Sequence, residues 1–225
     1  EYFVFFEINW NAKSISVAEI REKLNLGMDT LMFIDDNIFE REEVKSAHPE
    51  IECIDALDYE SLLSRQRLNP RFITEDSKKR RLLYQQNIKR EKIEFEFKGP
   101  KEDFLSSLDM NFIISTANEE DLKRAEELTV RTNQLNTNGK TYDYDELNTF
   151  RVLPNNQLLV CELTDKFGSY GKIGLALVEE QEEKWYIKLF LMSCRVMARG
   201  VGKVFMTYII KSASEQRKEL FTEFK

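Results

Sequence analysis

The chain has few of the residues that build zinc sites and disulfide frameworks. It contains one histidine, His48, and three cysteines spread along the sequence, Cys53, Cys161 and Cys194. No Cys or His lies beside His48 at metal-ligand spacing, which argues against a zinc site and against a histidine-based triad. We expect His48 at a helix end. An odd number of distant cysteines argues against a disulfide framework and favours a reducing, cytoplasmic location.

Long apolar runs and an excess of positive charge are also missing. No run approaches the roughly 18 consecutive apolar residues of a membrane span, and the aromatic N-terminus has neither the basic flank nor the cleavage site of a signal peptide. Among the 225 residues, 33 Lys and Arg stand against 40 Asp and Glu, a net charge of −7, which disfavours bulk nucleic-acid binding. We therefore expect neither a membrane nor a nucleic acid as a partner.

One segment departs from this acidic balance. Residues 71–98 are locally basic and include the run Lys78 to Arg81. Such runs usually form a solvated helix face, and the alternative is a docking surface for an acidic partner. The overall composition, 42% apolar and 32% charged, indicates a globular chain with enough apolar residues for one large or two modest domains.

The first half of the chain alternates helices with short apolar strands. The pattern predicts a helix over residues 14–26 capped by Gly27, a strand over 30–34, a helix over 38–46, a strand over 51–54 and a helix over 59–68. This alternation is typical of a parallel α/β sheet. We assign residues 1–68 to the first domain.

Asn69-Pro70 ends the alternation and begins a helical linker, residues 69–92, whose helix has its N-cap at Thr74 and runs to about Lys89. The second domain, residues 93–225, is predicted to contain a strand over 111–116, helices over 119–131 and 144–150, strands over 158–163, 172–178 and 185–193, a helix after Gly200, and the beginning of one more strand at 221–225. This order indicates a mixed α+β domain with antiparallel hairpins.

Two adjacent carboxylates, Asp35 and Asp36, follow the first predicted strand. Parallel sheets place ligands at the carboxyl ends of their strands, and hard oxygen ligands suit Mg²⁺, so the pair is a candidate metal site. The alternative is that Asp36 or Asn37 only caps the helix that follows.

Several multi-residue blocks occur along the chain together with Lys13: INW (8–10), LNLG (24–27), FIDDNIFEREEV (33–44), TEDSKKRRLLY (74–84), TNQLN (132–136), DKFGSYG (165–171) and SCRVMARGVG (193–202). With these blocks the sequence resembles FkbH-like proteins, which belong to phosphatase subfamily IIIC of the haloacid-dehalogenase superfamily and are fused to a GNAT-like acyltransferase domain. The resemblance spans nearly the whole chain. It implies an α/β fold in which the C-terminal part of a haloacid-dehalogenase-like, Rossmann-like parallel sheet precedes a GNAT-like mixed α+β domain.

The same resemblance implies roles for three residues of the first domain. Lys13 matches the lysine that neutralises charge on a nucleophilic aspartate and its phosphoryl group, and Asp35 and Asp36 match the pair that holds Mg²⁺. The DxDxT-type segment with the nucleophile should lie upstream of Lys13, where only 12 residues are present. We therefore expect a chain truncated at both ends, without the nucleophile segment and with an incomplete second domain.

In the second domain, Arg199, Gly200 and Gly202 stand between a strand and a helix. They would leave backbone N–H groups free for a pyrophosphate, which is how GNAT folds grip coenzyme A. Met197 stands where the GNAT pattern has Gln or Arg, so phosphopantetheine on a carrier protein is the other candidate ligand. The alternative is a helix start whose glycines serve close packing.

Four further residues are candidates for the site, and each also has an ordinary structural explanation. Asn133, Gln134 and Asn136 would bind substrate by resemblance, although such residues also form turns. Cys194, beside Arg195 and near a helix N-terminus, is a possible acyl acceptor. We favour its alternative, a small hydrophobic residue buried in a strand.

FkbH-like proteins take a glyceryl unit from bisphosphoglycerate, remove its phosphate and load the acyl group onto an acyl carrier protein. The resemblance therefore implies a glyceryl (or related acyl) transferase and phosphatase that uses Mg²⁺ and phosphopantetheine or coenzyme A. Its partners would be a small phosphorylated substrate and an acyl carrier protein. The alternatives are a phosphatase or acyltransferase for another small phosphorylated substrate, and a non-catalytic binding module.

Overall fold

The computed structural model describes residues 2–132 and 136–222 and divides into two compact units, Glu1–Ile73 and Thr74–Lys225. The division falls inside the segment predicted as a linker, so that residues from Thr74 onward pack as part of the second unit. No helix in the described ranges is long and apolar enough to cross a bilayer.

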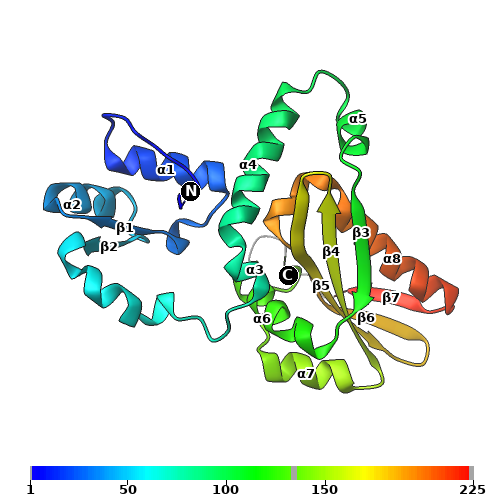
Figure 1. The fold of residues 1–225 in the computed structure, drawn as a ribbon. Helices are drawn as coiled ribbons and strands as arrows, with labels where there is room; N and C mark the ends of the chain where they lie inside the picture. Colours follow the sequence, from blue (N-terminus) through cyan, green and yellow to red (C-terminus); the bar gives the residue numbers. More distant parts are fainter. Residues whose placement is uncertain (1, 133–135, 223–225) are drawn as a thin grey trace. The chain divides into compact units, whose positions relative to one another are not determined.

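Unit 1 is a small α/β arrangement (Figure 1). Its elements are α1 (Lys13–Leu24), η1 (Met28–Thr30), β1 (Met32–Asp35), α2 (Ile38–Ala47), β2 (Glu52–Asp55), η2 (Ala56–Ser64) and η3 (Gln66–Leu68). The two strands pair in parallel, with Met32 opposite Glu52. Val17, Val44 and Ile51 form the small core that packs the helices against the strands. The predicted parallel pairing of the first two strands is confirmed.

Two segment ends in unit 1 differ from the prediction. Helix α1 ends at Asn25, which takes the left-handed conformation (φ 49°), so Asn25 and not Gly27 is the cap residue. The helix predicted over 59–68 consists instead of the 3₁₀ helices η2 and η3. Leu57 and Leu63 are exposed there, so this segment has no apolar face to hold a full α-helix against a core. His48 does end α2, as predicted.

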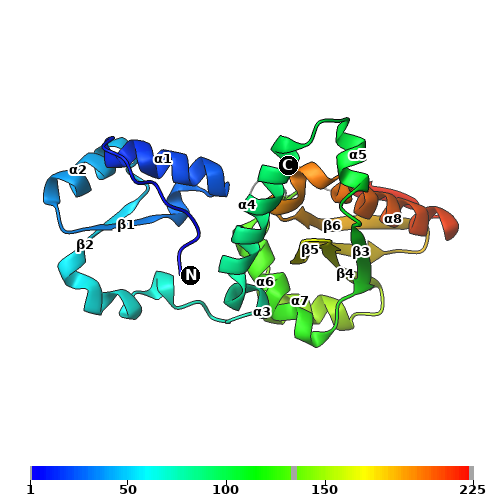
Figure 2. The same cartoon turned by 45° about the horizontal axis from the view of Figure 1, so that its top comes forward.

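Unit 2 contains a five-stranded mixed sheet with helices on both faces (Figure 2). Its elements are α3 (Glu75–Lys78), α4 (Arg80–Glu96), α5 (Lys101–Ser106), β3 (Asn111–Thr116), η4 (Glu119–Asp121), α6 (Leu122–Arg131), α7 (Tyr144–Val152), β4 (Asn156–Asp165), β5 (Gly168–Glu180), β6 (Lys184–Met192), η5 (Cys194–Arg199), α8 (Val201–Glu215) and β7 (Glu219–Thr222). The strand order is β3-β4-β5-β6-β7. Neighbours are antiparallel except β6 and β7, which are parallel and joined through α8.

The alternation of side chains along the strands separates two apolar layers. In β4, Leu159 and Cys161 face the layer that contains Phe205 of α8. Leu158 and Val160 face the opposite layer, with the apolar residues of α6 and α7. The strands therefore form the middle layer of a three-layer α/β/α unit, and the predicted mixed α+β order of its elements is confirmed.

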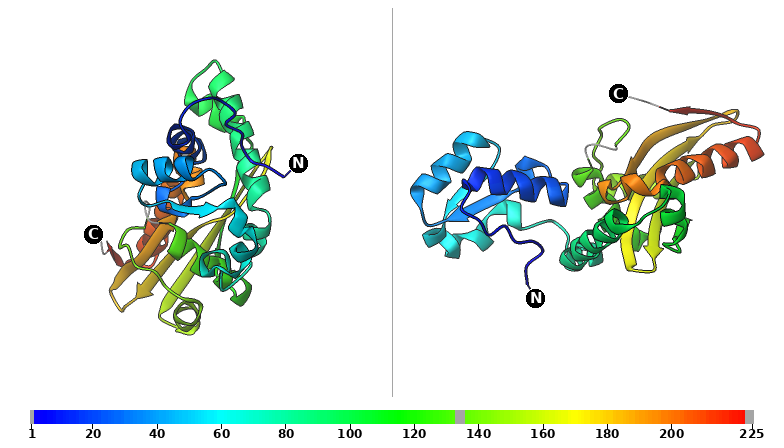
Figure 3. Two further views of the ribbon diagram at one scale, coloured as in Figure 1. Left: turned by 90° about the vertical axis from the view of Figure 1, so that its left-hand side faces the viewer. Right: turned by 90° about the horizontal axis from the view of Figure 1, so that it is seen from above.

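Strand β6 has different neighbours along its two halves. Leu177 of β5 pairs with Leu189, but the next residue pairs with Ile187, so Lys188 is an extra residue in the ladder, a β-bulge. Strand β7 pairs only with residues 184–187, before the bulge (Figure 3). Beyond it, the edge of β6 is bordered by residues 136–138, since the Thr137 N–H donates to the Phe190 carbonyl at 3.1 Å.

Helix α4, most of which was assigned to the linker, is fastened to unit 2 by buried charge. Arg90 donates to both carboxylate oxygens of Asp165 at 2.8 and 2.9 Å, and its guanidinium lies 3.8 Å from the ring centre of Tyr170. The Tyr170 hydroxyl donates to Asp165 at 2.9 Å. The side chains of Arg90 and Asp165 are 1% and 0% exposed. The segment predicted as a linker is thus largely a packed element.

Candidate functional site

Asp35 and Asp36 lie at the carboxyl end of β1, where the sequence predicted them. Asp35 Oδ1 accepts a hydrogen bond from the Asn37 N–H at 2.8 Å, and Asn37 caps α2 through the Phe39 N–H at 2.9 Å. The capping alternative is therefore fulfilled by Asn37 and not by Asp36. Asp36 is exposed, so one carboxylate is partly used by its own turn and the other faces solvent.

The structure pairs Lys13 with a different carboxylate. Its Nζ lies 3.6 Å from Glu40 Oε2, in the first turn of α2. It also lines a cavity of about 250 Å³ in unit 1 together with Val17, Phe33 and Ile51, and neither Asp35 nor Asp36 lines that cavity. Within the described residues, no three His, Cys, Asp or Glu side chains are arranged to hold a metal ion. These residues do not make a complete magnesium site.

The turn before α8 has the geometry of an anion-binding helix start. Gly200 takes φ +75°, and a Cβ there would meet nothing within 4 Å. The 15-residue helix has no side-chain cap, and the Lys203 N–H donates to the Gly200 carbonyl at 3.1 Å. The N–H groups of Val201 and Gly202 therefore precede the first intrahelical bonds and point out of the helix end. A Cβ at Gly202 would make only an ordinary 3.6 Å contact with Met192, so close packing does not explain these glycines.

Arg199 has a different role from the one predicted. Its guanidinium Nη1 lies 2.8 Å from Glu94 Oε2 of α4, and it also lies over the Phe104 ring of α5, 5.7 Å from the ring centre. The residue is buried. Because Glu94 and Phe104 already engage it, Arg199 fastens α4 and α5 to the turn instead of offering a free cation to a phosphate.

Asn136 lies beside the C-terminal half of β6. It forms a single antiparallel bridge with Leu191, and its Nδ2 donates to the Lys140 carbonyl at 2.8 Å. Its Oδ1, like the Thr137 hydroxyl, is buried without a hydrogen-bond partner in the described part of the chain. A buried unpaired acceptor of this kind often marks a place for a ligand or a water. Asn133 and Gln134 lie outside the described residues.

Cys194 does not sit in a strand, contrary to the alternative we favoured. Strand β6 ends at Met192, and Cys194 begins the 3₁₀ helix η5, where it is half-buried. Cys194 is one of the groups whose charge acts on Tyr84 of α4, together with Arg195 and Arg80. The thiol therefore lies just past the carboxyl end of β6, next in sequence to Arg195, with whose charge it interacts.

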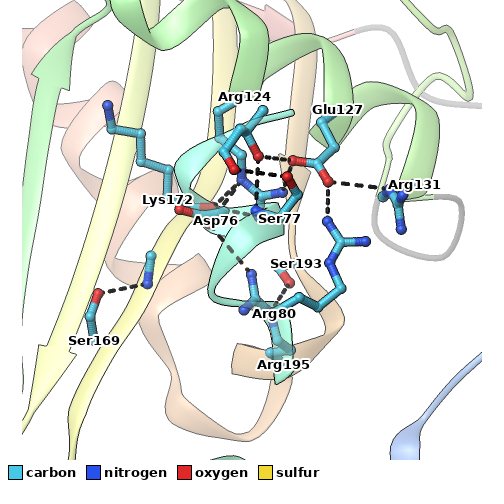
Figure 4. Close-up of polar contacts among 12 residues, drawn as sticks. Asp76, Ser77, Arg80, Arg124, Glu127, Arg131, Ser169, Lys172, Ser193 and Arg195 are labelled. Carbon is cyan, nitrogen blue, oxygen red and sulfur yellow. Dashed lines mark hydrogen bonds and ion pairs between the residues drawn. The ribbon is translucent and has the colours of Figure 1, made fainter. Parts of the chain in front are cut away.

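A cluster of charged side chains that the sequence did not reveal occupies the same region of unit 2, between α3, α4, α6 and the turn after β6 (Figure 4). Arg124 stands at its centre. Its Nε lies 3.0 Å from Asp76 Oδ2 and its Nη1 2.8 Å from Glu127 Oε2. Its Nη2 donates to the Lys172 carbonyl at 3.0 Å.

Glu127 is the second anion of this cluster. It accepts a hydrogen bond from the Thr74 hydroxyl at 2.8 Å and forms ion pairs with Arg80, Arg124 and Arg131. Burial raises the pKa of Glu127, but the charge and hydrogen bonds of Arg124, the Thr74 hydroxyl and the charge of Arg80 outweigh it and lower the pKa to about 2. Glu127 is therefore negatively charged at any pH at which the protein is normally handled.

Only part of this cluster had a signal in the sequence. Arg124, Glu127 and Arg131 stand at i, i+3 and i+7 on one helix face, which permits ion pairs along α6. Asp76 and Arg195 come from distant segments, and nothing local pairs them with α6. The run that contains Arg80 is predicted as a solvated face or a docking surface, since nothing local indicates that Arg80 turns inward to Glu127.

No protein-family model matches the sequence, and no curated protein matches it. Among solved structures, the chain is similar to an aminoglycoside 6'-N-acetyltransferase from Acinetobacter baumannii, with 9% identity and a TM-score of 0.40 over 51% of this chain and 80% of that one. It is also similar to a transcriptional regulator from Bacillus halodurans, with 16% identity and a TM-score of 0.39 over 50% and 80%. A third is a GNAT family acetyltransferase from Staphylococcus aureus, with 15% identity and a TM-score of 0.35 over 49% and 84%. Each likeness concerns about half of the chain.

Proposed function

We propose that unit 2 is an acyltransferase domain that holds a phosphopantetheine or coenzyme A thioester at the N-terminus of α8. The observation that carries the proposal is the uncapped start of this 15-residue helix, directly after Gly200 at φ +75°. Unpaired N–H groups and the positive end of the helix dipole both favour a phosphate there. The resemblance of this half of the sequence to a GNAT-like domain supports the same ligand.

The strand before this turn offers a path for the pantetheine arm. Strand β7 covers only the first half of the β6 edge, up to Ile187. The second half leads to the α8 N-terminus and has the buried, unpaired Asn136 Oδ1 beside it. An amide N–H of pantetheine would satisfy that acceptor, so the arm would pass beside residues 136–138, which border this edge of β6, with its phosphate at Val201 and Gly202.

The thioester supplies an activated acyl group, which an acceptor nucleophile takes up while the pantetheine thiol leaves with a proton. Cys194 lies at the same end of β6 and offers a covalent route. Its Sγ would attack the thioester carbonyl and later release the acyl group to the acceptor. If this route operates, Cys194→Ala abolishes transfer and Cys194 can be trapped as a thioester. If transfer is direct, the variant keeps most of its activity and no acyl-cysteine accumulates.

We further propose an acyl carrier protein as the source or recipient of the acyl group, with a small phosphorylated acid as the original substrate. Lys78 and Lys79 are exposed on α3 and at the start of α4, and carrier domains are usually acidic, so opposite charge would guide the encounter. Arg80, in contrast, turns inward to Glu127. The expected phosphatase step stays a prediction, because Lys13 pairs with Glu40 and, within the described ranges, no third metal-ligating side chain joins the two carboxylates.

The test is a pair of substitutions at Gly202. Gly202→Asp places a carboxylate in the first turn of α8. The positive end of the helix dipole stabilises this carboxylate, which would repel a phosphate at the same place. Gly202→Asn has nearly the same shape without the charge, and the 3.6 Å contact with Met192 leaves room for either side chain. We expect coenzyme A to bind the Asp variant about tenfold or more weakly than the Asn variant in isothermal titration calorimetry.

Two controls make the result decisive. The melting temperature of Gly202→Asp should equal or exceed that of Gly202→Asn, so that weaker binding is not a folding defect. Pantetheine without phosphate should bind both variants alike. Equal coenzyme A affinity in the two variants would place the phosphate elsewhere and end the proposal.

A further inference from the structure

A second anion site follows from the charge cluster around Arg124. We propose that Arg80, Arg131 and Arg195, beside Tyr84, form a binding site for the carboxylate or phosphate group of a small molecule. The site uses none of the residues at the α8 N-terminus and does not depend on the acyl-donor proposal.

The first observation is an excess of positive charge. The cluster joins four guanidinium groups to two carboxylates: Arg80, Arg124, Arg131 and Arg195 to Asp76 and Glu127. Among the described residues, the cluster therefore has two more positive than negative charges. Most of these side chains are largely shielded from solvent, where unbalanced charge is costly.

The second observation is that two of the arginines have unused donors. Arg195 donates through Nε to the Ser193 hydroxyl at 3.3 Å, and its Nη2 lies 3.9 Å from Asp76 Oδ2. Its side chain is only 14% exposed. Arg131 has one ion pair, at 3.4 Å to Glu127, and is 55% exposed. Each guanidinium thus keeps N–H groups that could grip an oxyanion with two parallel hydrogen bonds.

The third observation is that the charges of these groups act on one phenol, Tyr84. Burial raises the pKa of Tyr84, the Cys194 charge raises it further, and the charges of Arg195, Arg80 and Arg131 lower it. Burial also lowers the pKa of Arg131, and the charge of Arg80 adds to that effect. Arginine stays protonated in proteins, so this mutual repulsion persists in the folded protein and a bound anion would relieve it.

A purely structural role does not account for the whole cluster. Asp76, Arg124, Glu127 and Thr74 already fasten α3 to α6 by ion pairs and a hydrogen bond. That purpose needs one or two cations, not four. The net acidic chain disfavours a polymer such as a nucleic acid as the occupant, so the site suits a small molecule with one or two negative charges.

The test is calorimetric titration of the full chain with inorganic phosphate and, separately, with acetate, at fixed ionic strength. Arg131→Gln removes both the positive charge and the paired guanidinium N–H donors at an exposed position, whereas Arg131→Lys keeps the charge and removes the paired donors. Arg195→Gln tests the largely buried arginine of the same site. The matched control is Arg151→Gln on α7, because Arg151 donates its hydrogen bonds to the Asn148 side chain and takes no part in the ion pairs of the cluster. We expect one of the two anions to bind the wild type, Arg131→Gln and Arg195→Gln to weaken it about tenfold, Arg131→Lys to weaken it less, and Arg151→Gln to leave it unchanged.

The identity of the anion that binds decides between a phosphate and a carboxylate ligand. Should Arg195→Gln fail to fold, Arg131→Gln alone still tests the site, since its side chain is mostly exposed. Absence of binding by both anions would overturn the proposal. So would binding that falls equally in Arg131→Gln and Arg151→Gln, because that pattern indicates general charge attraction.

Discussion

The buried ion pair between Arg90 and Asp165 allows a sharp test of how α4 is held in unit 2. We consider Arg90→Met, which keeps the length of the side chain and removes its charge. Arg90 donates to both oxygens of Asp165 and to the Gly168 carbonyl, all within 3.0 Å. After the substitution Asp165 would retain the Tyr170 hydroxyl and the Phe167 N–H as donors, but no cation.

The expected cost is large for a single substitution. Removing one partner of a buried pair costs about 3–5 kcal/mol, because the remaining charge stays desolvated. Asp165→Asn should cost a similar amount, since it leaves Arg90 buried. The double variant should lose less than the sum of the two, with a coupling of about 2–3 kcal/mol. A domain of ordinary stability, about 5–15 kcal/mol, would still fold with either change.

The loss should depend on pH with a definite sign. Burial raises the pKa of Asp165, but hydrogen bonds from Arg90, Phe167 and Tyr170 and the Arg90 charge outweigh it, so the pKa lies below its ordinary value. In the wild type this stabilisation is complete above the unfolded pKa of about 3.9 and is lost as the pH falls through the lower folded value. Without Arg90 the folded pKa rises, and Arg90→Met should be less destabilising at pH 4 than at pH 7.

Tryptophan fluorescence isolates the relevant unit. The chain has two tryptophans, of which Trp10 in unit 1 is fully exposed and Trp185 in unit 2 is 1% exposed. A change in emission during urea unfolding therefore reports unit 2. If the two single losses simply add, or if the loss in Arg90→Met is the same at pH 4 and pH 7, the ion pair does not stabilise α4 in the way described.

Three further outcomes are expected. Gly171→Ala should lower the free energy of unfolding by about 1–3 kcal/mol, because Gly171 takes φ +75° and an added Cβ would come too close to Asp76 Oδ2. Gly200→Ala, at the same φ but with open space around the Cβ, should lower it less when unfolding is followed by Trp185 fluorescence. Cys194 should react faster with a dianionic aromatic disulfide than with a neutral one, and salt should reduce the ratio; Cys194→Ser supplies the background, and equal rates would contradict the positive surroundings. Charge reversal of Lys78 and Lys79 to Glu should slow association with a pantetheinylated carrier protein in stopped-flow measurements, and unchanged on-rates would remove α3 from the docking surface.

Local patterns in the sequence were enough to predict most elements of unit 2. The strand over 111–116 has the predicted bounds. Helix α7 begins at Tyr144, as predicted, because Asp143 and Glu146 form a reciprocal capping box. Apolar alternation and capping act over a few residues, so they can be read without knowledge of the fold.

Elements held by distant partners were missed or misassigned. Helix α4 carries few buried apolar residues, and its place in unit 2 depends on Arg90, whose partner Asp165 is 75 residues away in the sequence. Helix α5 was not predicted, since its one buried residue, Phe104, packs on the aromatic ring of Phe97, 5.5 Å away between ring centres. One apolar contact in six residues leaves no periodic signal.

The candidate sites show the same difference between local signals, which the sequence reveals, and contacts of distant residues, which it does not. The start of α8 was predictable because glycines between a strand and a helix form a local motif. The direction of Arg199 was not, since Glu94 of α4 decides it. Arg124 and its neighbours converge from several segments, and only the folded chain brings them together.

The bulge at Lys188 changes which residues of β6 face α8. Before it, odd-numbered residues such as Trp185 and Ile187 face α8, and after it, even-numbered residues such as Phe190 and Met192 do. Deleting Lys188 would join Ile187 to Leu189 and give a regular ladder in which both halves keep their faces, whereas deleting a residue elsewhere in the strand would turn over every residue beyond it. The loss of one residue from this strand should therefore be tolerated at Lys188 and not at its neighbours, and substitutions of the Lys188 side chain leave the pairing unchanged.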